Sequence, residues 1–309
     1  MNDTERISLE RGQIILRQRV LSRMPQAGDF PTAIGGLTMY RRDEASKIEN
    51  CFYKPIILKI VQGRKRVLVG KDEFAYGEDD LLIAGLDMPA ASGIVDASAE
   101  RPCLSMVVDL DQNLIAQLAL EVPPATIEPK ASVLGLVVQR TEPEIQDAFL
   151  RLEELLDKPQ QIPILAPMII REIHYRVLTG PSGSLLRSFH TIGSQSNQVA
   201  RAITWLRVNF KESVQVEDLA EKVNMAPSTF HRRFKEVTTL SPLQYQKSLR
   251  LHEAKRLMLV SHLDAGRACE AVGYESLTQF NREYKRFFGE PPRRNVVRLR
   301  KESALPLSP

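Results

Sequence analysis

The sequence predicts an α+β chain with two domains: an N-terminal antiparallel β-barrel or sandwich with flanking helices, followed by an all-α C-terminal domain. Three observations support this fold class. Short β-prone runs separated by Gly, Asp and Pro fill residues 32–120, a helical period dominates afterwards, and the last third contains an internal repeat. A chain of 309 residues is too long for one ordinary hydrophobic core and has the length expected of two domains.

The composition is that of a soluble globular protein, with 43% hydrophobic and 26% charged residues. No apolar run approaches the roughly 18 residues that a membrane span needs, and residues 1–10 lack the basic and apolar regions of a secretion signal. Cys51, Cys103 and Cys269 are too scattered for a disulfide framework or a zinc site. We therefore expect a cytoplasmic protein without a membrane partner.

The N-terminal part begins with a helix-compatible segment at 5–24, which ends before Pro25. Runs such as PIILKIVQG, KRVLVG, DDLLIAG and CLSMVVDL then predict short strands. Apolar residues at helical spacing predict a helix from about 143 to 156, and a second helix follows at about 164–178. A Gly-Pro-Ser-Gly break at 180–183 predicts a linker at 181–193, between domains at 1–180 and 194–300.

The C-terminal domain contains a repeat. An offset of 50 residues matches Phe230 with Phe280 and Arg232 with Arg282, and an offset of 49 matches Ala220 with Cys269. Cys269 is therefore expected to be a small core residue. Each copy has a short helix (216–223 and 264–272), a tight turn (224–226 and 273–275) and a longer basic helix (227–238 and 276–288). This succession is typical of a helix-turn-helix, whose second helix enters a DNA major groove.

The two longer helices each have an apolar face and a polar face. Phe230, Phe234 and Val237 recur at spacings of four and three, which predicts a buried stripe. Arg can donate bidentately to guanine and Asn can pair with adenine, whereas Lys residues near the helix ends suit phosphates. The residues expected to contact DNA are Ser228, Thr229, His231, Arg232, Lys235, Thr278, Gln279, Asn281, Arg282 and Lys285.

Charge distribution and helix length agree with DNA binding. Residues 194–301 contain 20 Lys and Arg against 11 Asp and Glu, whereas the rest of the chain contains 22 against 27. A basic module of this kind can neutralise phosphates. Residues 241–259 predict one helix, roughly 28 Å long at 1.5 Å per residue. A spacer of that length could hold two recognition helices near the ~34 Å separation of successive major grooves.

The stretch from about 199 to 295 resembles the DNA-binding domain of the AraC/XylS family. The resemblance rests on DLAEKVNMAPSTFHRRFK, SPLQYQKSLRLHEAKRLM and RACEAVGYESLTQFNREYKRFFGEPP. It implies base contacts by Ser228, His231, Arg232, Thr278, Asn281 and Arg282. Two positions depart from the family pattern: Ala226 replaces a capping Ser and Thr239 replaces a Gly. The first motif should therefore lack a side-chain cap and a residue that favours the left-handed conformation.

The N-terminal half resembles the sensor domain of one AraC subgroup, through YKPIILKIVQGRKRVLVG, DEFAYGEDDLLIAGLDMPA and REIHYRVLTGPSG. This resemblance implies a cupin-like β-barrel followed by helices. Cupin barrels often hold a metal through histidines, but none of the five histidines lies in the predicted barrel. No phosphate loop or nucleophile elbow is found either. We therefore expect no metal, no cofactor and no enzymatic activity.

Residues 30–130 are expected to bind a small organic effector, since a barrel of short strands can enclose one small ligand. The candidate effector-binding residues are Cys51, Lys54 and Arg64. Lys54, Arg64, Lys65 and Arg66 surround a Gly turn, which fits either a solvated hairpin or a contact to an anionic effector. Core packing is the favoured interpretation for Cys51 and Cys103. In a sharper variant, an electrophile or oxidant modifies a Cys51 thiolate assisted by Lys54.

These features together predict a transcription regulator that binds double-stranded promoter DNA and responds to a small-molecule effector. Helices at 143–180 could form a homodimer interface or pack on the barrel, and RNA polymerase is a possible further partner. Two alternatives stay open. One is a DNA-targeted enzyme such as an alkyl-accepting repair protein, which would need a reactive cysteine. The other is a constitutive DNA-binding protein whose barrel only supports dimerisation.

Overall fold

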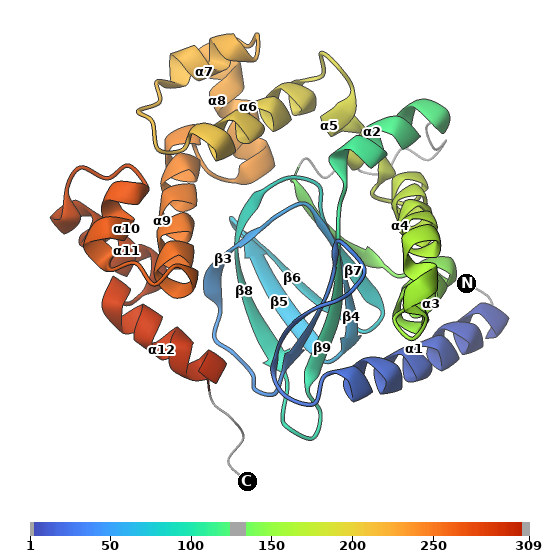
Figure 1. Cartoon of the computed structure of the whole chain (residues 1–309). Coiled ribbons are helices and arrows are strands. Elements are labelled where there is room, and N and C mark those ends of the chain that lie inside the picture. Colours follow the sequence, from blue (N-terminus) through green and yellow to red (C-terminus); the bar gives the residue numbers. More distant parts are fainter. Residues whose placement is uncertain (1–2, 124–133, 305–309) are drawn as a thin grey trace.

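The computed structural model describes residues 3–123 and 134–304, and within them it confirms the α+β fold. Two antiparallel sheets face each other across a shared interior (Figure 1). The larger sheet has the strand order β1-β2-β9-β4-β7-β10, and the smaller one has the order β3-β8-β5-β6. The strands are β1 (Gly28–Pro31), β2 (Leu37–Arg42), β3 (Glu49–Tyr53), β4 (Ile56–Gln62), β5 (Arg64–Val69), β6 (Asp72–Gly77), β7 (Asp80–Ala84), β8 (Met88–Asp96), β9 (Cys103–Asp109) and β10 (Leu136–Arg140).

The helices form two groups, those of the N-terminal part on one side of this barrel and those of the C-terminal part on the other (Figure 1). Those of the N-terminal part are α1 (Asp3–Arg23), α2 (Gln112–Glu121), α3 (Pro143–Leu155), α4 (Ile162–Thr179) and α5 (Gly183–His190), with a short 3₁₀ turn at Pro159–Gln161. Those of the C-terminal part are α6 (Gln195–Asn209), α7 (Val216–Lys222), α8 (Pro227–Thr238), α9 (Pro242–Val260), α10 (Ala265–Ala271), α11 (Leu277–Phe288) and α12 (Pro292–Ala304). The helices predicted at 5–24, 143–156 and 164–178 correspond to α1, α3 and α4.

Strand alternation divides the N-terminal core into two clusters, because successive side chains on a strand point to opposite faces. On β9, Leu104, Met106 and Val108 pack against α1, α3 and α4 on the outer face of the larger sheet. Val107 points the other way and joins the interior between the sheets. That interior also contains Ile60 of the larger sheet and Val67 of the smaller one. The helices therefore cover one sheet, while the other sheet faces the C-terminal domain.

The linker predicted at 181–193 is largely helical. Residues Gly183–His190 form α5, in which Leu186 and Phe189 are buried. Leu186 joins the core under α4, and Phe189 joins the first core of the C-terminal domain. The Gly and Pro residues end α4 at Thr179 but do not leave an extended tether, because these two apolar side chains gain more from burial than from exposure.

The C-terminal domain has two small cores, one for each repeat. The first is built around Phe230 and Phe234 of α8, and the second around Phe280 and Tyr284 of α11. The long helix α9 contributes Tyr245 to the first core and Met258 to the second. Cys269 is buried in the second core, as the repeat predicted. Over the described residues, no helix is both long and apolar enough to cross a membrane.

Candidate nucleic-acid interface

The two helix-turn-helix units repeat each other down to individual backbone conformations. In the turn after the short helix, Asn224 has φ 57° and Gly273, 49 residues later, has φ 81°. After the longer helix, Thr239 has φ 67° and Gly289, 50 residues later, has φ 79°. These left-handed positions recur because both units must turn the chain at the same points, and glycine adopts them without a Cβ penalty.

The first unit lacks two of the local stabilising features that the second unit has. Ser276 accepts a hydrogen bond from the backbone N–H of Gln279 at 3.3 Å, which caps α11. Ala226 occupies the same place before α8 and provides no side-chain cap. Thr239 carries a Cβ in the left-handed region where the second unit has Gly289. The structure thus confirms both departures that the sequence indicated.

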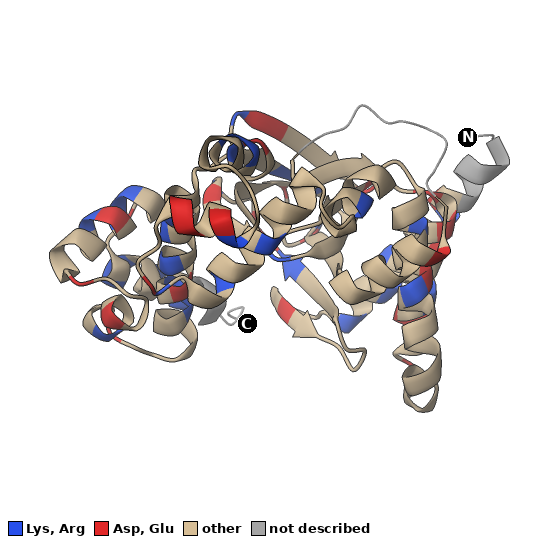
Figure 2. Cartoon of the chain, turned by 90° about the horizontal axis from the view of Figure 1, so that it is seen from above, with Lys and Arg blue, Asp and Glu red and all other residues tan. Residues whose placement is uncertain are grey.

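Both recognition helices expose their polar faces. The structure places nine of the ten predicted DNA-contacting residues in exposed positions: Ser228, His231, Arg232, Lys235, Thr278, Gln279, Asn281, Arg282 and Lys285. Thr229 is half-buried. Figure 2 shows that Lys and Arg recur along the helices of the C-terminal domain. These side chains are free to approach a partner, since the apolar stripe of each helix faces its own core.

The two equivalent arginines differ in their surroundings. Arg232 donates to Glu236 one turn later, with Nη1 and Oε1 3.0 Å apart. Arg286 stands in the equivalent position after Arg282. Within the part of the chain that the structure describes, Arg282 has no hydrogen bond or ion pair. The second recognition helix therefore presents its cations more openly than the first.

The N-terminal domain contacts both recognition helices near their C-terminal ends. The backbone N–H of Gly135 donates to the carbonyl of Val237 at 3.1 Å. Gly70, in the β5–β6 turn, lies so close to Thr239 that a Cβ at this glycine would come within 2.8 Å of it. On the second helix, the amide of Asn50 donates to the carbonyl of Phe287. The exposed N-terminal halves of α8 and α11 take no part in these contacts.

The connecting helix α9 is held by a polar cluster at the start of β8. The hydroxyl of Tyr245 donates to the carbonyl of Asp87 at 2.8 Å. The Asp87 carboxylate in turn lies 3.1 Å from Arg207 of α6. Burial raises the pKa of Asp87, and the neighbouring Arg207 opposes that rise. This cluster ties the first core to the barrel.

Strand β3 links the barrel interior with the DNA-binding domain. Phe52 packs edge-on against Tyr245 and His252 of α9, with ring centroids 5.7 Å apart in both pairs. Cys51 and Tyr53, on the opposite face of the same strand, line the barrel interior. The sequence predicted a role for Cys51 of β3 but none for Phe52. The available signal was the succession of Cys51, Phe52 and Tyr53, which indicates burial but does not reveal which partner each face meets.

The structure separates the predicted effector residues. Lys54 is exposed, and so is Arg64, which lies on the outer face of β5 and 3.9 Å from Asp96. Cys51 lines the barrel interior. So does Lys65, which differs from Arg64 by one position and therefore points to the other face of the strand. Of the three predicted effector residues, Cys51 therefore faces the interior, whereas Lys54 and Arg64 do not.

Burial disfavours the thiolate form of all three cysteines. Burial raises the pKa of Cys51 to about 12, although Lys65 and Lys255 oppose this effect. Burial also raises the pKa of Cys103 and of Cys269. Desolvation thus disfavours the Cys51 thiolate, and the cations that oppose this effect are Lys65 and Lys255 rather than the predicted Lys54. Among the described residues, no group of three or more His, Cys, Asp or Glu is arranged to hold a metal ion.

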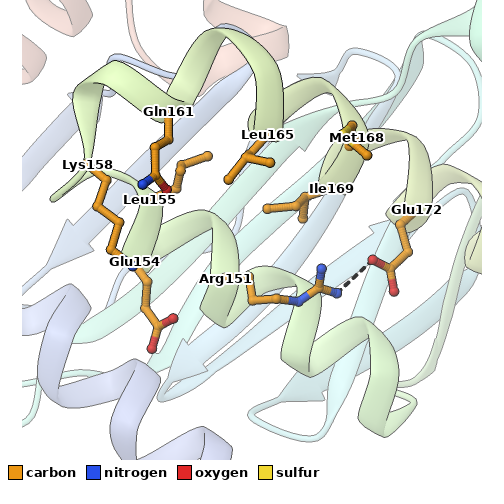
Figure 3. Close-up of a pocket in the computed structure, with 9 residues that line it drawn as sticks. All are labelled: Arg151, Glu154, Leu155, Lys158, Gln161, Leu165, Met168, Ile169 and Glu172. Carbon is orange, nitrogen blue, oxygen red and sulfur yellow. Dashed lines mark hydrogen bonds and ion pairs between the residues drawn. The ribbon is translucent and has the colours of Figure 1, made fainter.

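The α4 helix presents an uncovered apolar stripe. Ile164 is 68% exposed and Met168 63%, and Tyr175 is also exposed. Beside this stripe, a groove of 370 Å³ runs between α3 and α4 (Figure 3). Figure 3 shows Leu165 and Ile169 along the groove, with the Arg151–Glu172 ion pair at one end. The α3 helix, in contrast, buries its apolar residues on the barrel.

Comparison with known proteins matches both halves of the chain. Residues 33–185 match the model of the AraC-type transcriptional regulator N-terminus, and residues 219–295 match a helix-turn-helix domain. The HTH-type transcriptional activator RhaS of Pectobacterium carotovorum is 29% identical over 101 residues, which are 33% of this chain and 36% of RhaS. RhaS of Escherichia fergusonii is 28% identical over 157 residues, 50% of this chain and 54% of that protein. The chain thus aligns with a third to a half of these relatives.

Solved structures extend the likeness to the whole fold. An apo form of ToxT from Vibrio cholerae superposes with a TM-score of 0.60 at 9% identity, over 86% of this chain and 99% of that chain. Wild-type ToxT with a bound unsaturated fatty acid gives a TM-score of 0.58, also at 9% identity, over 84% and 94%. At this identity the comparison establishes the fold alone. The two family matches and the RhaS relatives show that the chain belongs to the AraC/XylS family of transcriptional regulators.

Proposed function

We propose that this protein is a cytoplasmic, non-enzymatic transcription regulator that binds double-stranded promoter DNA through both helix-turn-helix units. The observation that carries the proposal is the pair of exposed polar faces on α8 and α11, which occupy equivalent positions in the two helix-turn-helix units. Arg232 and Arg282 would read guanine, and Asn281 would read adenine. Lys235 and Lys285 would contact phosphates and fix the position of the helices on DNA.

We infer that the sensor domain controls how the two recognition helices are presented. A ligand changes activity only if it binds one arrangement of the protein better than another. The sensor domain touches the C-terminal ends of both recognition helices through Val237, Thr239 and Phe287. A ligand that shifts β3 from inside the barrel would also shift Phe52 against α9. The fatty acid bound by ToxT supports effector control in a protein of this fold.

We also propose that the protein acts as a homodimer through α4. The exposed stripe of Ile164, Met168 and Tyr175 is the kind of apolar patch that marks an interaction surface. In a symmetric dimer the same stripe would meet itself, which is the common arrangement for homodimers. Met168→Glu should therefore shift the protein toward monomer in sedimentation velocity. Val208→Glu alters an exposed apolar residue of α6 and should leave the sedimentation unchanged.

The DNA-binding proposal is tested by pulling down fragmented genomic DNA with the purified full-length protein and sequencing what is retained. We expect a small set of promoter fragments that share one motif. The double variant Arg232→Ala, Arg282→Ala should lose that set, whereas Arg140→Ala, which changes an exposed arginine of the barrel, should retain it. Retention of fragments without a common motif would contradict sequence-specific binding.

A further inference from the structure

A lysine in the interior of the barrel has no anion paired directly with it among the described residues. On β5, Val67 and Val69 belong to the interior cluster, so Lys65, two residues before Val67, points to the same side. Lys65 pairs with Tyr76 in the β5–β6 ladder, and the Tyr76 side chain is buried in that interior. The thiols of Cys51 and Cys103, the guanidinium of Arg42 and the carboxylate of Asp29 lie within electrostatic reach of it, and Asp29 is already paired with Arg42.

The neighbouring cation is already satisfied, whereas Lys65 is not. Arg42 forms an ion pair with Asp29 at 2.5 Å and donates to the carbonyls of Gly28 and Arg41. Within the described ranges, Lys65 forms no hydrogen bond and no ion pair. Burial lowers the pKa of Lys65, because an ammonium group loses its hydration there. A cation inside a barrel is costly unless an anion pairs with it directly.

A second unsatisfied group faces the same interior from the opposite sheet. Ser105 of β9 is 1% exposed, and its hydroxyl has no partner among the described residues. Its position between Leu104 and Met106, which face the helices, directs it into the barrel. It is paired across the sheet with Tyr40 on one side and Ile60 on the other. Buried hydroxyls are rarely left without a partner, so this one marks a place for a polar ligand atom.

The rest of the interior provides further hydroxyls and apolar surface. The hydroxyls of Tyr53 and Tyr76 lie 3.3 Å apart, and both side chains are part of the interior cluster. Ile60 and Val107 of the larger sheet face them. A single positive charge, a few hydroxyls and an apolar wall are the features of a site for a small amphipathic anion.

We propose that the barrel binds a small carboxylic acid, with its carboxylate on Lys65, a polar atom on Ser105 and its apolar body against Ile60 and Val107. This inference rests on the effector role proposed for the barrel and names the class of ligand. It also assigns the charge contact to Lys65 rather than to Arg64 or Lys54, which lie outside the interior.

The test measures ligand binding to the full-length protein without DNA, by calorimetry and thermal unfolding. The probes are small carboxylates, each matched with its neutral amide, beginning with 4-methylpentanoate and 4-methylpentanamide. Wild-type protein should bind at least one acid at least tenfold more tightly than its amide. Lys65→Met, which keeps the apolar stem, should lose this preference, and Ser105→Ala should weaken binding several-fold. Arg64→Met removes a charge from the outer face of the same strand and should bind as the wild type does.

The ligand-free variants provide an independent readout. Because Lys65 and Ser105 lack partners, Lys65→Met and Ser105→Ala should unfold at the same temperature as the wild type or higher. A clearly lower unfolding temperature for Lys65→Met would assign it a structural role and overturn the proposal. Equal binding of acids and amides would also overturn the proposal, as would the absence of binding by any acid in the panel. None of these outcomes depends on promoter binding, so failure of the DNA proposal is recognised separately by the pulldown.

Discussion

The ion pair between Arg232 and Glu236 should make the first recognition helix the weaker reader of DNA. Their side chains are 56% and 35% exposed, with Nη1 and Oε1 3.0 Å apart. An exposed pair one helical turn apart is worth about 0.3–0.5 kcal/mol, and Arg232 must give it up to reach a base. A bidentate arginine contact to guanine is worth about 1–3 kcal/mol. Arg282 has no such pair to break and has Arg286 one turn later.

We therefore expect Arg282→Ala to weaken specific binding by about 1–3 kcal/mol, and Arg232→Ala by about 0.3–0.5 kcal/mol less. Glu236→Gln should tighten DNA binding about twofold, because it removes the free energy of the Arg232–Glu236 ion pair and 1.4 kcal/mol corresponds to a factor of ten in affinity. Loss of its negative charge near the phosphates acts in the same direction. Fluorescence anisotropy with a labelled promoter fragment measures these changes at fixed salt.

Asp147→Asn is the matched control. Asp147 forms an exposed ion pair with Arg151, also one turn apart, but on α3 of the sensor domain. Its removal should leave DNA affinity unchanged. If Glu236→Gln binds DNA as the wild type does, or more weakly, Arg232 does not turn from Glu236 to DNA and the reasoning fails. The reasoning also fails if Arg232→Ala costs more than Arg282→Ala.

Three further outcomes follow from the structure. Lys235→Ala and Lys285→Ala should weaken binding to all sequences alike and reduce the slope of log K against log salt by about one each; an unchanged slope would place these lysines away from phosphates. Ala226→Ser should stabilise the first unit by about 1 kcal/mol in urea unfolding, and Ser276→Ala should destabilise the second by a similar amount. Burial, with Lys255 nearby, lowers the pKa of His252 to about 3, so the unfolded state binds the extra proton below about pH 6.5. The free energy of unfolding should therefore fall as the pH decreases from there, and His252→Phe should remove up to about 1.4 kcal/mol per pH unit of that fall. The prediction is contradicted if the free energy of unfolding of the variant and of the wild type changes equally between pH 7 and pH 5.

The DNA-binding domain was almost fully determined by its sequence. A repeat fixes which residues are equivalent, so Phe230 and Phe280 had to be core positions and Arg232 and Arg282 outward ones. Helical periodicity then assigns each face, because residues three and four apart lie on one side of a helix. Even the departures at Ala226 and Thr239 could be interpreted against the second copy. The ion pair of Arg232 was also within reach of the sequence, through the spacing of four to Glu236.

The barrel was less accessible to sequence analysis. Strands have a period of two, so a shift of one residue exchanges the inner and outer faces. The run of Arg64, Lys65 and Arg66 contains a cation on each face, and only the register with β6 and β8 shows that Lys65 is the inner one. Pairing between strands far apart in sequence also placed Ser105 opposite Tyr40.

Contacts between the domains were decided by the tertiary structure alone. The segment at 181–193 reads as a linker because Gly and Pro precede it, yet Leu186 and Phe189 find burial sites in two different cores. In the same way, Phe52 reads only as a strand residue until α9 is seen beside it. Local pattern specifies that an apolar side chain must be buried, because exposure to water is costly. Which surface buries it depends on the packing of distant segments, and no local pattern contains that information.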